Sequence, residues 1–347
     1  MRCALIEYNV YHDITFPMFV YLLRRLQIQV DIYTPTRNIA RNVLFDTDTS
    51  DVVMRRTDAR LFGVKEFLTK YRAYDFVIMN SLEPKQWLQR AAALDAPTLA
   101  LLHDAHVYQH DDDYKRYFAK RNRKIIVLWK HLADYLSSVV DAYCCSPVYF
   151  GETSIQKVEN AATFCAQGVI QYCHRNYPAL LTALEELTRT GDTGFLVRIV
   201  GGIGTADLEK FLKESHVKQV DSFIELIKGD ISYHAYLSAI GSSHFLLPLL
   251  DTTHSDYLPF QEDKMTTSIP CSVGLGAIPI IHQDFAKTYG IEAAAITYEN
   301  GGLSDAMRRA IAMNDVERTQ KRKALRDLKH GLLEQSLTNL RTAIETF

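Results

Sequence analysis

A lysine and three hydroxyl residues lie close together before a predicted helix in the second half of the chain. Lys264 precedes the cluster Thr266, Thr267 and Ser268, within the segment Phe245–His282, whose pattern is strand, loop, helix and strand. A helix N-terminus presents unpaired N–H groups and about half a positive charge, so it attracts anions. The hydroxyl residues can cap that end, and the lysine adds a full charge. A diphosphate fits this combination, although an ordinary capped helix beside a solvated lysine would show the same pattern.

The length and composition indicate a two-domain globular protein. The 347 residues exceed what most single cores hold and fit two domains of about 150 residues each. A net charge of −2 provides no general attraction to nucleic acid, so no nucleic-acid partner is expected and an anion site must be local. The six cysteines show no paired Cys-x-x-Cys spacing, which favours reduced thiols and a cytoplasmic location. No signal segment or membrane-spanning segment is recognised.

The first half alternates short apolar runs with helical patterns. Strands are predicted at Cys3–Tyr8, Gln29–Tyr33, Asp75–Met79, Thr98–Leu102 and Ala142–Cys145. Helices are predicted at Phe16–Leu26 and Gln86–Leu94, and Phe67–Tyr71 is the end of another helix. Ile125–Leu128 fits either a strand or the start of a helix through Val140. Strands separated by helices pair in parallel with right-handed crossovers, so this half is predicted to be a doubly wound α/β domain.

Ligands of such domains bind where the strands end, near the point at which the strand order reverses. The loops at those ends are Asn9–Thr15, Asn80–Lys85 and His103–His110. Because Tyr8–Asp13 contains no glycine, the sequence does not favour a dinucleotide site after the first strand.

The second half repeats the same alternation. Strands are predicted at Thr163–Gln167, Phe195–Val200, Phe223–Ile227 and Phe245–Leu249, with helices at Tyr177–Leu187, Asp207–Lys213 and Ser232–Ile240 and a helical region from Ser304 onward. The sequence therefore predicts two Rossmann-like domains with parallel sheets, 1–160 and 161–325, separated by a polar linker at 152–160. A last helix, 326–347, is expected to pack back toward the N-terminal domain.

Five segments of the second half resemble, in order and spacing, the C-terminal domain of the group 1 GT-B glycosyltransferases. In Gly168–Leu181 a strand ends in glycine, and a basic residue precedes a helix with paired leucines. The other four segments are Phe195–Gly202, Ile227–Leu237, Phe245–Leu249 and Gly276–Ile281. In the first half, Pro97–Asp104 resembles a strand ending in a His-Asp pair that faces the interdomain cleft of that family.

The sequence also departs from the pattern of group 1. The retaining members carry two glutamates eight residues apart, and that register falls here on Lys264 and Ser272. The glycine-rich loop after the first strand is absent, and the usual Gly-Arg pair is replaced by Gln167-Gly168. These departures leave the anomeric outcome open.

The resemblance implies transfer of a sugar from a nucleotide diphosphate sugar, with UDP or GDP, to a carbohydrate or lipid-linked acceptor, as in polysaccharide biosynthesis. It implies no metal or other cofactor, because basic side chains and a helix N-terminus stabilise the leaving diphosphate. Three groups of site residues follow: catalytic His103 and Asp104; donor-phosphate-binding Arg175, Lys264, Thr266, Thr267 and Ser268; and nucleotide-binding Gly201, Gly202, Glu299 and Asn300.

Each of these residues has a structural alternative. His103 serves as a base if transfer inverts the anomeric centre, hydrogen-bonds the donor sugar if it retains it, or only satisfies backbone groups after a strand. Arg175 could pair with a carboxylate at the surface. Glu299 and Asn300 could simply form a turn before Gly301, without contacting a nucleotide. The glycines after Val200 could likewise form only a tight turn between a strand and a helix.

Two further features suggest other partners or chemistry. The basic segment Lys115–Lys124 could contact anionic lipid at the inner face of a membrane, or a charged acceptor, or form a solvated helix face. The histidines at 103, 106 and 110 lack a companion cluster, so no metal is expected. The functional alternatives are a nucleotide-sugar 2-epimerase of the same fold and a catalytically degenerate nucleotide-sugar-binding subunit.

Overall fold

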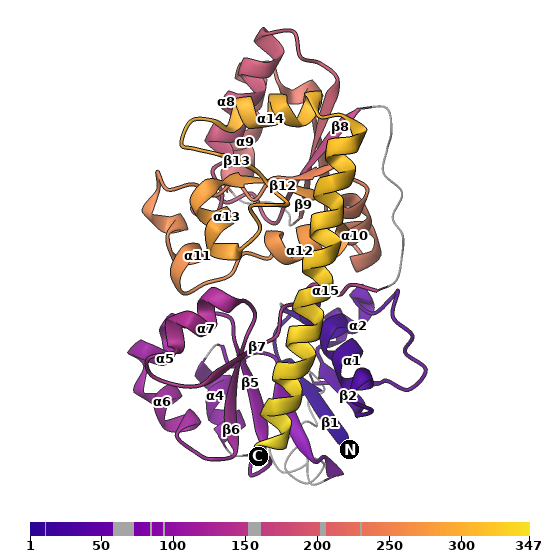
Figure 1. Cartoon of the computed structure of the whole chain (residues 1–347), viewed down its shortest axis with the longest axis vertical. Coiled ribbons are helices and arrows are strands. Elements are labelled where there is room, and N and C mark those ends of the chain that lie inside the picture. The colour runs from indigo at the N-terminus through magenta and orange to yellow at the C-terminus, as the bar shows by residue number, and fades with distance from the viewer. Residues whose placement is uncertain are drawn as a thin grey trace. The chain divides into compact units, whose positions relative to one another are not determined.

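The computed structural model describes residues 1–10, 12–57, 73–83, 85–92, 94–151, 161–201, 206–229 and 231–347. Its chain divides into two compact units, each built around one parallel sheet (Figure 1). Unit 1 comprises residues 1–153, 262–265 and 330–347, and unit 2 comprises 154–261 and 266–329. The predicted helix Phe67–Tyr71, the predicted linker and Gly202 lie outside the described residues.

Unit 1 contains a seven-stranded sheet in the order β3-β2-β1-β4-β5-β6-β7. Its strands are β1 Arg2–Ile6, β2 Gln29–Thr34, β3 Val53–Arg56, β4 Phe76–Met79, β5 Thr98–Leu102, β6 Arg123–Val127 and β7 Ala142–Cys144. Its helices include η1 Asp13–Thr15, α1 Phe16–Arg25, α2 Thr36–Arg41, α4 Lys85–Ala92, α5 His106–His110, α6 Asp112–Phe118 and α7 Lys130–Leu136. Every residue of β4 and β5 is buried, as expected for parallel strands covered by helices on both faces.

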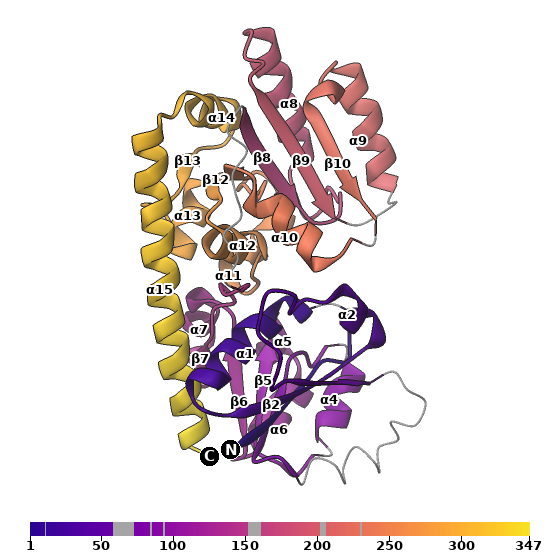
Figure 2. The same ribbon diagram turned by 90° about the vertical axis from the view of Figure 1, so that its right-hand side faces the viewer.

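Unit 2 contains a six-stranded sheet in the order β10-β9-β8-β11-β12-β13, and Figure 2 shows its strands β8, β9 and β10 side by side. Its strands are β8 Ala162–Gln167, β9 Phe195–Gly201, β10 Ile224–Lys228, β11 Phe245–Leu246, β12 Ile278–His282 and β13 Ile296–Tyr298. Its helices include α8 Tyr177–Arg189, α9 Ala206–Val217, η3 Asp221–Phe223, α10 Tyr233–Gly241, η4 Ser255–Tyr257, α11 Pro259–Glu262, α12 Ser268–Leu275, α13 Gln283–Tyr289 and α14 Leu303–Ala312.

Both sheets reverse their strand order beside their first strand. The reversal lies between β1 and β4 in unit 1 and between β8 and β11 in unit 2. Crossovers on opposite sides of the first strand leave a crevice at the carboxyl ends of these strand pairs, where doubly wound proteins bind ligands. The loops after β1, β4 and β5, and those after β8, β9 and β11, are therefore the places to look for a site.

The last helix, α15 Asp315–Glu345, contributes residues to both units. Within unit 1, Leu340 of this helix is fully buried, and the Ser146 N–H donates to Ser336 Oγ at 2.9 Å. Asn339 Nδ2 also donates to the carbonyl of Cys144 at 2.8 Å. These bonds satisfy backbone groups at the end of β7 that would otherwise be buried without partners. None of the helices in the described ranges is both long and apolar enough to cross a membrane.

Two predicted elements differ from the observed ones, and one ambiguous segment is resolved. The strand predicted at Phe245–Leu249 ends at Leu246, because Pro248 has no N–H to donate and Leu249 adopts a left-handed conformation with φ of 55°. The ambiguous segment from Ile125 belongs to strand β6. Helical structure after Ser304 is interrupted between α14 and α15.

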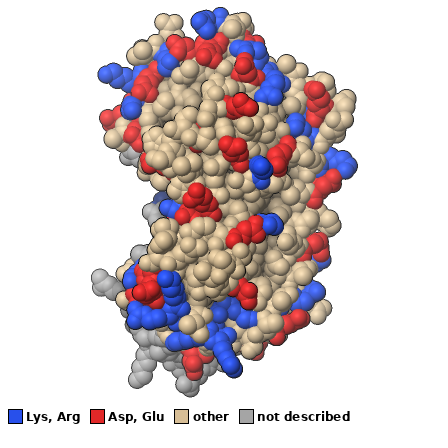
Figure 3. Space-filling model, turned by 60° about the vertical axis from the view of Figure 1, so that its left-hand side comes forward, with Lys and Arg blue, Asp and Glu red and all other residues tan. Residues whose placement is uncertain are grey.

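The basic segment Lys115–Lys124 is not one helix face. Helix α6 ends at Phe118, and Arg123 opens β6 with its guanidinium buried and bonded to Thr98 Oγ1 at 3.0 Å. Arg116 pairs with Asp113 within α6. Figure 3 accordingly shows basic side chains next to acidic ones in the lower part of the view.

Candidate functional site

Arg175 lies at the carboxyl edge of the unit 2 sheet, where only 8% of it is exposed. Its Nη1 donates to the carbonyl of Pro248, after β11, at 3.0 Å. A Cβ on Gly168, whose φ is 103°, would lie 3.0 Å from Nη2, so the glycine leaves room for the guanidinium. Within the described residues no carboxylate forms an ion pair with Arg175. A buried cation without a counter-charge is costly, which favours an anionic ligand beside it.

The start of α12 is tied to the end of β8. Gln167, the last residue of β8, donates from Nε2 to Thr267 Oγ1 at 2.8 Å. Thr267 is the exposed N-cap residue, and its side chain accepts no bond from the helix, contrary to the predicted capping. The buried Thr266 instead accepts the Ser268 N–H at 3.4 Å. The hydroxyl cluster therefore lies at the same sheet edge as Gly168.

Two buried polar atoms at this edge have no hydrogen-bond partner among the residues that the structure describes. They are Oγ of Ser268, which is fully buried, and Oε1 of Gln167. Unsatisfied buried polar atoms are rare in proteins. Because the N–H groups of a helix start are close to Ser268, an anion bound there would receive several donors.

The predicted nucleotide-binding residues that the structure describes lie on two loops of unit 2, one after β9 and one after β13, and three strands separate β9 from β13 in the sheet. Gly201, at the end of β9, is packed so tightly that a Cβ would lie 2.5 Å from the Gly168 carbonyl oxygen. Glu299 and Asn300 are exposed after β13, in a turn closed by a 2.8 Å bond from the Gly302 N–H to the Glu299 carbonyl. Asn300 Nδ2 donates to Thr252 Oγ1, in the loop after β11, at 2.8 Å.

Ser272, which occupies the register of the second group 1 glutamate, has a structural role. Its buried hydroxyl donates to the Ala277 carbonyl at 2.7 Å, where α12 ends. This position therefore supplies no carboxylate to the sheet edge.

His103 follows β5 at the corresponding edge of unit 1. Its Nε2 lies 2.8 Å from the carbonyl oxygen of Asn80. Because a carbonyl only accepts, Nε2 carries the hydrogen and Nδ1 keeps its lone pair in the neutral ring. The ring stacks on His12 with centroids 3.6 Å apart, and burial lowers the pKa of His12 to about 4 and that of His103 well below its usual value. Both rings are therefore neutral at pH 7.

A buried hydrogen-bond network supports this pair, and the sequence analysis did not identify it as part of the site. Glu7 accepts the Asn9 N–H at 2.7 Å and Asn80 Nδ2 at 2.8 Å. Asn80 also donates to the His12 carbonyl at 2.9 Å and accepts from Thr15 Oγ1 at 2.5 Å. Burial raises the pKa of Glu7 to about 8. The available signal was an acidic residue interrupting the first apolar run.

Asp104 is brought together with Lys264 rather than held free. The two residues form an antiparallel backbone bridge, and Lys264 Nζ lies 3.2 Å from Asp104 Oδ2. Beside them, the Ala105 N–H donates to the Asp263 carbonyl at 2.8 Å, and His106 Nδ1 lies 3.3 Å from Asp263 Oδ2. Lys264 thus belongs to unit 1, whereas the hydroxyl cluster that follows it belongs to unit 2.

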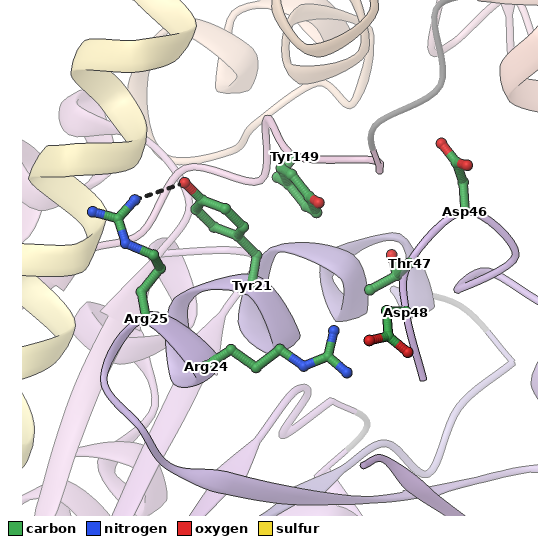
Figure 4. A pocket seen from close by; sticks show the side chains of 7 residues that line it. All are labelled: Tyr21, Arg24, Arg25, Asp46, Thr47, Asp48 and Tyr149. Carbon is green, nitrogen blue, oxygen red and sulfur yellow. Dashed lines mark hydrogen bonds between the residues drawn. The ribbon is translucent and has the colours of Figure 1, made fainter. Parts of the chain in front are cut away.

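A separate pocket of about 300 Å³ lies against the last turns of α1 (Figure 4). Tyr21 and Tyr149 stack in it with ring centroids 4.3 Å apart, and Arg25 Nη1 donates to the Tyr21 hydroxyl at 2.9 Å. Arg24 pairs with Asp51. None of the site residues predicted from sequence lines this pocket, whose cations already have protein partners.

No family model matches this chain, and no curated protein matches it in sequence. Solved structures match over nearly the whole chain. A glycosyltransferase from Rickettsia africae ESF-5 is 12% identical, with a TM-score of 0.70 over 99% of this chain and 98% of that one. Anabaena HepE in complex with UDP and glucose is 11% identical, with a TM-score of 0.65 over 99% of both chains.

A TarM variant of S. aureus, in complex with UDP, fondaparinux and α-GlcNAc-glycerol, is 9% identical, with a TM-score of 0.65 over 97% of this chain and 99% of that one. Such identities show the fold alone. The chain has the GT-B fold, with two Rossmann-like parallel-sheet units, which confirms the fold class predicted from the sequence.

Proposed function

We propose that this protein is a glycosyltransferase that moves a sugar from a nucleotide diphosphate sugar to a hydroxyl of a carbohydrate or lipid-linked acceptor without a metal ion. The observation that carries the proposal is the buried Arg175 beside the start of α12, where Ser268 Oγ has no partner among the described residues. An arginine and a helix N-terminus together suit a diphosphate. Anabaena HepE and S. aureus TarM were crystallised with UDP, so UDP is the first nucleotide to test.

The proposed donor site uses unit 2 for the nucleotide. Arg175, the exposed Thr267 hydroxyl and the N–H groups near Ser268 would stabilise the charge that develops on the leaving diphosphate. Gly201 and Gly202, with Glu299 and Asn300, would contact the nucleoside end. We retain Lys264 as the second phosphate cation, although a phosphate there must compete with Asp104 for its ammonium group.

The proposed acceptor side lies on unit 1. His103 would act as a neutral hydrogen-bonding group, because its lowered pKa keeps a proton off Nδ1 at pH 7. Asp104 would bind a sugar hydroxyl through the carboxylate that also holds Lys264.

The first experiment measures nucleotide binding by isothermal titration calorimetry with UDP, GDP and CDP. Arg175→Lys keeps the charge but loses the planar guanidinium, and we expect it to bind the nucleotide about 10-fold more weakly. Arg175→Ala removes both the charge and the guanidinium, and we expect about 100-fold weaker binding. These values correspond to the loss of about 1.5–3 kcal/mol, the contribution of a charged hydrogen bond. Arg308→Ala, at a half-exposed arginine already paired with Asp305, is the matched control and should bind normally. Failure of the wild-type protein to bind any of the three nucleotides would contradict the proposal.

The second experiment tests turnover with a panel of nucleotide sugars and acceptors. Acceptor-dependent release of the nucleoside diphosphate supports glycosyl transfer. Conversion of the donor to its C2 epimer would identify the epimerase alternative, and nucleotide binding without any turnover would identify a binding subunit.

A further inference from the structure

Another pocket of unit 1, with a volume of about 240 Å³, lies at the edge of the sheet where β6 and β7 begin. Its walls come from the end of α6 and from the turns that precede these two strands. Because β5, β6 and β7 pair in parallel, this edge is opposite to the carboxyl ends of the strands, where His103 lies. The pocket is therefore separate from the candidate site of unit 1.

The lining of this pocket is strongly basic. The structure describes one lining carboxylate, Asp141, and four lining cations, which are Lys120, Arg121, Arg123 and Lys124. Within the described ranges, none of these four cations has a carboxylate oxygen within 4.0 Å. The cations thus outnumber the carboxylate without being neutralised by it, and a local excess of positive charge attracts anions.

Arg123 is the buried cation of the pocket, with only 4% of its surface exposed. Its Nη1 donates to Thr98 Oγ1 at 3.0 Å and to the Asn122 carbonyl at 3.2 Å, and its Nη2 donates to the Leu94 carbonyl. Its Nε is buried and has no hydrogen-bond partner among the residues that the structure describes. The neutral oxygens hold the guanidinium in place but leave its charge uncompensated. Because arginine is rarely buried without a counter-charge, the site favours an anionic ligand.

The other three cations are also free of counter-charges. Lys124 is partly buried, and its Nζ donates to the Ala343 carbonyl at 2.9 Å and to the Thr346 hydroxyl, both at the end of α15. Lys120 and Arg121 are exposed, and their side chains make no hydrogen bond to any described residue. The fold therefore fixes two of the cations and leaves the other two able to close on a ligand.

We propose that this pocket binds a phosphate group. Its volume of about 240 Å³ is below the roughly 300–1,000 Å³ of pockets for drug-sized ligands, so it suits a small anion better than a whole nucleotide. Guanidinium and ammonium groups both bind phosphate oxygens through charged hydrogen bonds. Free phosphate and the headgroup of an anionic lipid carry the same group, so the experiment has an arm for each source. The proposal does not depend on the donor site of unit 2.

The first arm measures inorganic phosphate by isothermal titration calorimetry at about 0.15 M NaCl, where charges are screened beyond about 8 Å. We expect the wild type to have a site with a dissociation constant below about 1 mM. Lys120→Ser combined with Arg121→Ser should weaken this site at least about 10-fold, from the loss of two charged hydrogen bonds. Its melting temperature should not change, because both side chains are exposed and unpaired.

A matched control removes the same two charges from elsewhere in the basic segment. Lys115→Ser combined with Arg116→Ser alters cations that already pair with carboxylates of α6, so this variant should bind phosphate as the wild type does. Asp141→Asn removes the lining carboxylate and should tighten binding severalfold. Since the donor site proposed for unit 2 would also bind phosphate, hydrogen exchange of residues 119–124 and 140–143 locates the anion.

The second arm measures cosedimentation with vesicles of phosphatidylcholine, with and without phosphatidylglycerol. Binding of either probe that is lost with Lys120 and Arg121 supports the proposal, and the probe that binds identifies the source of the phosphate. Three results would overturn it: neither probe binds, binding is unchanged when Lys120 and Arg121 are replaced, or the control variant loses as much binding.

Discussion

At the scale of single residues, burial determines what each ionisable group can do. Arg175 is a buried guanidinium without a carboxylate partner among the described residues, which suits it to an anion. His103 and Glu7 instead adopt the neutral form more readily, because burial penalises the charged form. The unit 2 edge thus holds a buried cation, whereas the fully buried Glu7 and the neighbouring His103 at the unit 1 edge favour their neutral forms.

A pH-dependent stability follows from Glu7. Its pKa is raised from 4.5 to about 8 in the folded state, so between these values the folded protein binds more protons than the unfolded chain. Stability from this group is therefore present below pH 4.5 and is lost as the pH rises through about 8. Glu7→Gln removes the titration, and we expect the melting temperature of the variant, relative to wild type, to be higher at pH 8.5 than at pH 5. A difference that does not change with pH would contradict the raised pKa.

At the scale of elements, the ends of strands and helices impose different demands on glycine. Gly201 ends β9 against the Gly168 carbonyl, whereas Gly276 ends α12 with φ of 70° and has open space around it. The first glycine is required by contact and by conformation, and the second by conformation alone.

This difference predicts that alanine lowers the free energy of unfolding by different amounts at the two glycines. Gly276→Ala should lower the free energy of unfolding by about 1 kcal/mol, the cost of a left-handed alanine. Gly201→Ala should cost more than twice as much, because its Cβ would meet a backbone oxygen at 2.5 Å and force β9 away from β8. Urea denaturation measures both values. Equal losses would show that the close contact at Gly201 relaxes freely.

At the scale of the whole molecule, one helix supplies core residues to both units. Leu325 and Leu340 are both fully buried in α15, but the first belongs to unit 2 and the second to unit 1. The two leucines therefore provide matched probes of the two cores.

Truncating either leucine should destabilise its own unit. Leu340→Ala should lower the free energy of unfolding by about 2–5 kcal/mol and reduce hydrogen-exchange protection first in β1, β4 and β5. Leu325→Ala should reduce protection first in β8 and β9. Hydrogen exchange followed by mass spectrometry measures protection strand by strand. Uniform loss of protection in both variants would show that the two units unfold as one.

The sequence by itself determined the two doubly wound units and the loops at the ends of their strands, because apolar runs alternating with helical patterns are local signals. It also singled out the hydroxyl cluster as the start of a helix, and Arg175 through its place in a motif. Only the tertiary structure decided that Asp104 meets Lys264 and that His103 stacks on His12. Those contacts join segments far apart in the chain, and which side chains meet depends on strand order and packing rather than on residue spacing.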